Sequence, residues 1–195
     1  LPICFPVLFI SHGAPTFALE PGLAGPLLRG LAGRLPKPRA VVIVSPHWMT
    51  RQPAVSMAPR QETIHDFGGF PAELYRLSYP AAGAPAIAEQ VAARLEAAGL
   101  PVTRDPQRGL DHGAWVPMMH LYPDADVPVL QVSLPRYRST ADYVALGRAL
   151  APLREEGILV IGSGSITHNL YDLHPEDTPP VPYAVAFVEW FASRL

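Results

Sequence analysis

Short, continuously apolar runs alternate with helical patterns along the whole chain, and this alternation restricts the possible folds most. Runs that are apolar on both faces suit parallel strands covered by helices on each side. The pattern therefore predicts an α/β fold with a largely parallel central sheet flanked by helices. The expected strands are Val7–Ile10, Ala40–Ser45, Ala54–Met57, Val102–Arg104, Val127–Ser133 and Gly157–Ile161. The expected helices are Leu23–Leu35, a short one near Ala72–Leu77, Pro85–Ala98, His112–Leu121 (interrupted at Pro117), Ala141–Leu153 and Pro182–Leu195.

The 195 residues are enough for one domain with a substantial core. The sequence has no internal repeat and no segment with the composition of a linker. We therefore expect residues 1–195 to form a single domain.

The composition argues against several classes of partner. The chain is 49% hydrophobic and 16% charged, and its formal net charge is -2, so a nucleic acid or an anionic membrane surface is not an expected partner. No apolar run reaches the roughly 18 residues that cross a bilayer. A single cysteine, Cys4, excludes a disulfide within the chain and favours a reducing compartment, so we expect a cytoplasmic protein. The composition does not determine an oligomeric state.

Histidines follow three of the expected strands. His12 ends the run "PVLFISH", His47 follows "VVIVSP", and His168 follows the glycine-rich "GSGSIT". The carboxyl ends of parallel strands meet at one edge of a sheet, where ligands of α/β proteins gather. Imidazole is a versatile ligand for zinc, iron and copper. The spacing thus predicts one shared site at the carboxyl ends of the strands, in which the imidazoles are metal ligands or catalysts, although a single histidine there is more often a hydrogen-bonded loop residue.

Other residues could line the same site. His112 lies in "LDHGAWVP", and His65 in "IHDFGGFP" suits the rim of a pocket. Trp48 could form a pocket wall, but core packing is the commoner fate of tryptophan. The glycines and serines of "GSGS" are expected to form a loop that could bind an anion. Asp111 is expected at the N-cap of the following helix.

Five segments in order resemble the class III extradiol ring-cleavage dioxygenases, in particular their 4,5-DOPA-dioxygenase-like branch. They are "FISHGAP", "VIVSPHW", "IHDFGGFPAELYRLSYPAAGAP", "LDHGAWVP" and "GSGSITHNL", and the resemblance covers nearly all of residues 5–170. It implies that His12 and His47 are metal ligands and that His168 is the acid–base catalyst. It also implies that His112 contacts substrate or oxygen and that His65 lies near the substrate entrance.

The resemblance further implies the cofactor and the small-molecule partners. The expected metal is Fe(II), with open positions for a catechol substrate and O₂, and Zn(II) could occupy the same site in an inactive form. Members of this family carry a third metal ligand, histidine or glutamate, in a further C-terminal segment. The sequence ends at Leu195 before such a motif, so we expect it to lack this segment; a lost or substituted ligand is the alternative.

Two other functions remain open at this stage. A zinc-dependent hydrolase would need a general-base carboxylate near the metal, and Asp66 and Asp111 are the only local candidates. The second is a metal-free binding protein on the same scaffold. It remains open because the sequence lacks the third metal ligand.

Overall fold

The computed structural model describes residues 4–174 and 178–194. The chain divides into two compact units, Leu1–Gly164 and Ser165–Leu195. The expectation of a single domain over residues 1–195 stays a prediction.

The first unit is built on a six-stranded, mostly parallel sheet with the order β1-β6-β2-β5-β3-β4. All neighbouring strands are parallel except β3 and β5, which are antiparallel. The strands are β1 (Val7–Ser11), β2 (Ala40–Thr50), β3 (Ala54–Ser56), β4 (Thr103–Asp105), β5 (Val129–Pro135) and β6 (Ile158–Gly164). The predicted α/β fold with a largely parallel sheet is confirmed.

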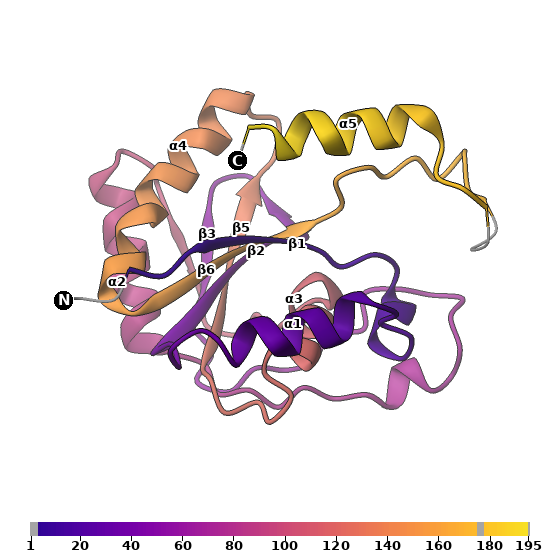
Figure 1. Cartoon of the computed structure of the whole chain (residues 1–195). Coiled ribbons are helices and arrows are strands. Elements are labelled where there is room, and N and C mark those ends of the chain that lie inside the picture. Colours follow the sequence, from indigo (N-terminus) through magenta and orange to yellow (C-terminus); the bar gives the residue numbers. More distant parts are fainter. Residues whose placement is uncertain (1–3, 175–177, 195) are drawn as a thin grey trace. The chain divides into compact units, whose positions relative to one another are not determined.

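Helices cover both faces of this sheet (Figure 1). The helices of the first unit are α1 (Ala24–Ala32), α2 (Pro85–Ala97), α3 (His112–Leu121) and α4 (Thr140–Leu150). Within residues 4–164, the unit also contains three 3-10 helices, Pro15–Ala18, Leu74–Arg76 and Ala151–Glu156. The helix predicted over Ala141–Leu153 is therefore shorter than expected, since α4 ends at Leu150 and the 3-10 helix Ala151–Glu156 follows it.

The alternation of side chains along β2 explains this layering. Val41 and Ile43 point to the face packed against α1 and α3, whereas Val42 points to the face packed against α2 and α4. All three side chains are fully buried. Because both faces are covered, the strand needs apolar residues at every position, which is the continuous run seen in the sequence.

The course of β2 differs from the prediction, since the strand continues past Ser45 to Thr50. Its pairing with β5 passes from Ser45–Ser133 directly to Met49–Leu134, so Pro46, His47 and Trp48 form a bulge. A proline is tolerated there because the bulged residues do not donate to the ladder. His47 therefore lies within an irregular strand and not beyond its end.

Two other predictions were wrong in detail. Gly162, Ser163 and Gly164 belong to β6, so they do not form the predicted anion-binding loop. Helix α3 runs through Pro117 without interruption, although proline removes the hydrogen bond that residue 117 would give to the carbonyl of Gly113.

The second unit contains α5 (Pro182–Ala192), which begins with the proline expected at its first position. The predicted final residue of this helix, Leu195, lies outside the described residues. Within the second unit, the Tyr183 hydroxyl donates a hydrogen bond to Asp172 at 2.7 Å.

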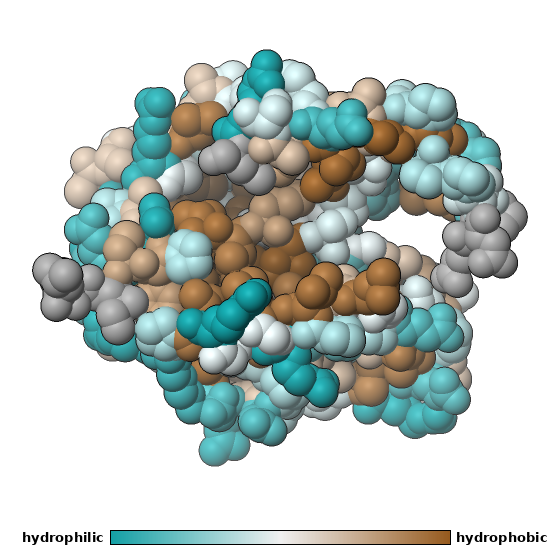
Figure 2. Space-filling view, in the orientation of Figure 1, coloured by the Kyte–Doolittle hydropathy of each residue, from teal (hydrophilic) through white to brown (hydrophobic). Residues whose placement is uncertain are grey.

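Strand β1 forms one edge of the sheet and carries exposed apolar side chains (Figure 2). Phe9 of β1 and Leu27 of α1 line a groove of about 370 Å³ in the first unit. Among the described helices, none is long and apolar enough to cross a membrane.

Candidate metal centre

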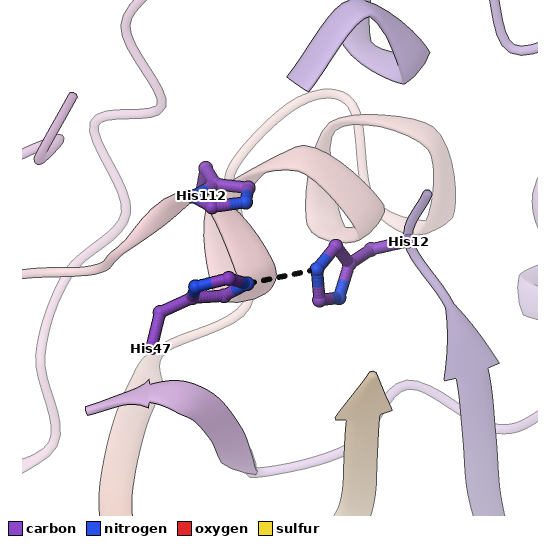
Figure 3. A group of neighbouring side chains, drawn as sticks. All are labelled: His12, His47 and His112. Carbon is purple, nitrogen blue, oxygen red and sulfur yellow. Dashed lines mark hydrogen bonds between the residues drawn. The ribbon is translucent and has the colours of Figure 1, made fainter. Parts of the chain in front are cut away.

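Three histidines from separate segments meet at the carboxyl ends of the strands (Figure 3). His12 directly follows β1, His47 lies in the bulge of β2, and His112 begins α3. One ring nitrogen from each histidine lies within 4.8 Å of the corresponding nitrogens of the other two. Such a group of imidazoles can hold a metal ion.

The closest approach within the group is between His12 and His47, whose Nε2 atoms are 3.0 Å apart. Two nitrogens bound about 2.1 Å from one ion and at right angles to each other are also about 3.0 Å apart. The separation therefore fits two neighbouring ligands of an octahedral ion. The prediction that these two imidazoles converge is confirmed.

His112 is held from its outer side by Asp66. The Oδ1 atom of Asp66 accepts hydrogen bonds from the backbone N–H and the Nδ1 atom of His112, at 2.8 and 2.9 Å. Burial alone would raise the pKa of Asp66, but these hydrogen bonds and the charge of His112 lower the pKa below its ordinary value. Asp66 is thus a carboxylate that orients His112.

A fully buried carboxylate, Asp111, supports the segment that carries His47. It accepts hydrogen bonds from Ser45 Oγ at 2.7 Å, Gln131 Nε2 at 2.8 Å and Arg108 Nη2 at 3.0 Å. The Ser45 hydroxyl in turn accepts a hydrogen bond from the backbone N–H of His47. Asp111 stands at the predicted N-cap position of α3, but its side chain does not cap the helix. Because three donors occupy it, it is unsuited to be the general base of a hydrolase.

The absence of a side chain at Gly113 allows α3 to pack closely on β2. A Cβ atom at this position would lie 2.9 Å from Cδ2 of His47 and would also collide with the Ser45 hydroxyl. The first turn of α3 therefore brings His112 and His47 together, with their ring centroids 3.9 Å apart.

Comparison with known proteins identifies this arrangement. The family model described as the catalytic LigB subunit of aromatic ring-opening dioxygenase matches residues 25–195. The chain belongs to this family. It is therefore a non-haem extradiol dioxygenase that opens aromatic rings, as the sequence motifs predicted.

Relatives of this dioxygenase match it over nearly its whole length. It is 42% identical over 191 residues to the 4,5-DOPA dioxygenase extradiol of Beta vulgaris, covering 96% of this chain and 71% of the relative. It is also 42% identical over 192 residues to the Escherichia coli K12 protein of the same name, covering 97% and 70%. The crystal structure of an uncharacterized Escherichia coli K12 protein superimposes with a TM-score of 0.80 at 37% identity, covering 97% and 72%.

Aromatic side chains border the histidine cluster of the dioxygenase on one side. The ring of Phe67 meets that of His112 edge to face, with centroids 5.7 Å apart. His65 packs against Phe67, Tyr75 and Trp115, and its Nε2 atom bonds the carbonyl oxygen of Leu77 at 3.1 Å. His65 therefore lies in an aromatic wall beside the cluster.

Trp48 and His168, the other predicted site residues, do not belong to the three-histidine group. Trp48 is only 7% exposed, and the guanidinium of Arg108 lies 5.1 Å from its ring centre. His168 is exposed in the second unit, beyond the end of β6. The substrate role of Trp48 and the catalytic role of His168 stay predictions.

The sequence motifs did not reveal the outer partners of the histidines. From the sequence alone, Asp66 is a candidate hydrolase base, and nothing in "IHDF" indicates that it bonds His112. The sequence places Ser163 in a glycine-rich loop, whereas in the structure its hydroxyl contacts His12. Neither contact has a local sequence signal, because each joins segments far apart in the chain.

Proposed function

We propose that this dioxygenase opens the ring of a catechol such as DOPA with O₂, using Fe(II) bound by His12 and His47. The observation that carries the proposal is the 3.0 Å separation of their Nε2 atoms, which suits two ligands of one octahedral ion. The relatives' names support a DOPA-like catechol as the substrate.

The donor set suits the metal. The family is metal-dependent, and imidazole nitrogen is a normal ligand for ferrous iron as well as for zinc. A bound ferrous ion would supply open positions that hold the catechol and O₂ side by side. Zinc binds such ligands more tightly but has no redox chemistry, so zinc-loaded protein is expected to be inactive. A cytoplasmic location would suit ferrous iron, because reducing conditions preserve it.

His112 is proposed as a catalytic residue facing substrate or oxygen. Since Asp66 accepts a hydrogen bond from its Nδ1–H group, the lone pair of the neutral ring is on Nε2. This nitrogen can accept a proton from a catechol hydroxyl, and the Asp66 carboxylate stabilises the imidazolium that results. His168 is proposed, from its place in the family motif, as the principal acid–base catalyst.

The aromatic wall is proposed to receive the substrate ring. Phe67 is half-buried beside His112, so its ring can pack against a planar catechol without losing contact with the protein. His65 and Trp48 are proposed to contact the substrate at the rim and the wall of this site.

The test is oxygen consumption by the metal-loaded protein. Metal-free protein is loaded with Fe(II) without air, mixed with DOPA or catechol, and then exposed to O₂. We expect oxygen uptake together with a yellow ring-opened product, and neither from zinc-loaded protein or the His12→Ala variant. Iron binding without oxygen uptake on any catechol would contradict the proposed function.

A further inference from the structure

The hydroxyl of Ser163 joins three elements behind the histidine cluster. It lies 2.8 Å from Nδ1 of His12, which follows β1, and it donates a hydrogen bond to the carbonyl oxygen of Gly113 in α3. Ser163 itself belongs to β6 and is 6% exposed, and His12 is 2% exposed. These contacts are therefore shielded from water.

Pro117 explains why the carbonyl of Gly113 needs this donor. In an α-helix this carbonyl would accept the N–H of the residue four positions later, which is residue 117. Proline has no N–H, so the helix leaves the Gly113 carbonyl without its usual partner. A buried carbonyl without a donor is costly, and the Ser163 hydroxyl supplies the donor.

The direction of this bond determines the state of His12. A carbonyl oxygen can only accept, and a hydroxyl has a single hydrogen, so the Ser163 hydrogen points to Gly113. The Ser163 oxygen must then accept from His12, whose Nδ1 atom carries the ring proton. A neutral imidazole has only one N–H, so the lone pair on Nε2 points toward His47.

We propose that Ser163 is a positioning residue that holds His12 in the Nδ1–H tautomer and thereby strengthens metal binding. The inference rests on the proposed role of His12 as a metal ligand through Nε2. Outer partners of this kind orient the ring of a ligand and raise its basicity. Ser163 thus fixes the tautomer of His12 in the metal-free protein, with the Nε2 lone pair available for a metal ion.

The first measurement is the tautomer of His12 in metal-free protein, by ¹⁵N NMR of its ring nitrogens. We expect the proton on Nδ1 in the wild type and a mixture of tautomers in Ser163→Ala. A wild-type ring protonated on Nε2 alone would overturn the inference without any variant.

The second measurement is the affinity for Co(II) or Zn(II), by competition with a chelator. Removing an outer partner of a ligand typically weakens metal binding about 10- to 100-fold, and we expect this for Ser163→Ala. Ser163→Thr keeps a hydroxyl and should restore much of the affinity. The matched control is Ser133→Ala in β5. This change also removes a buried hydroxyl, which is hydrogen-bonded to the Thr50 hydroxyl and the Ala54 backbone N–H.

The outcomes separate this inference from the proposed function. If Ser163→Ala binds metal as tightly as the wild type, Ser163 is not a positioning residue, and the metal site stands. If Ser133→Ala weakens binding as much as Ser163→Ala, the effect is general destabilisation and the inference fails. If the wild type binds no metal, the proposed function itself fails.

Discussion

The Nε2 atoms of His12 and His47 lie 3.0 Å apart, although 35 positions separate the two residues in the sequence. His12 directly follows β1 and His47 lies in the bulge near the carboxyl end of β2, and both strands pair with β6. The parallel sheet therefore creates the pair, and each half of the pair should be required for metal binding.

Replacing either member of this pair should remove the metal. Loss of an outer partner weakens metal binding about 10- to 100-fold, and we expect His12→Ala and His47→Ala to weaken it more than that. Metal content after loading and desalting measures this directly. His174→Ala is the matched control, because His174 is exposed and bonds Asp172 within the second unit. Full metal content in His12→Ala would exclude it as a ligand.

His112 should affect turnover more than metal content. Removing a general acid or base typically lowers the rate about 10²- to 10⁴-fold, and we expect a fall of this size in kcat for His112→Gln. Metal analysis of the same sample distinguishes the possible roles. Retained metal supports a catalytic role, whereas loss of metal comparable to His12→Ala would make His112 a ligand.

Much of this arrangement could be predicted from the sequence. Continuous apolar runs predicted the strands, and His12 and His47, which follow the predicted strand ends Ile10 and Ser45, indicated a site at the carboxyl ends of the strands. The extension of β2 could not be predicted. Pro46 has the signature of a strand end, and the strand continues after the bulge because Met49 pairs with Leu134 and Thr50 with Pro135.

The outer contacts of the site were also beyond sequence reasoning. Ser163 bonds His12 across 151 positions, and Asp66 bonds His112 across 46. Such contacts depend on tertiary packing and have no characteristic spacing. Pro117 indicated an interrupted helix. In the structure the helix continues, and the Ser163 hydroxyl of β6 donates the hydrogen bond to the Gly113 carbonyl that the proline cannot give.

Gly113 should be needed for both stability and metal binding. A methyl group there would press on His47 and Ser45, and overpacking of this kind costs about 1–3 kcal/mol in the free energy of unfolding. We therefore expect Gly113→Ala to lower both the denaturation midpoint and the metal affinity. Gly147→Ala in α4 is the matched control. Its Cβ would meet nothing within 4 Å, so it should stabilise the helix by about 0.5–1 kcal/mol.

Phe67 should contribute to substrate binding. Its ring stands beside His112 in the aromatic wall, so Phe67→Leu removes a flat surface while keeping an apolar side chain. We expect a higher KM for the catechol and the same metal content, measured by oxygen uptake at varied substrate concentration. An unchanged KM would show that the substrate ring packs elsewhere.

Asp111 should contribute more to stability than an exposed carboxylate such as Asp142. Its side chain is fully buried, and Asp111→Ala would leave Arg108, whose side chain is 19% exposed, without its ion-pair partner. Removing one member of a buried ion pair costs about 3–5 kcal/mol, because the remaining charge is uncompensated. Chemical denaturation measures the loss. Asp142→Ala should cost much less, since Asp142 caps α4 in an exposed capping box. Equal losses in the two variants would mean that the Asp111 network contributes no more than a surface cap.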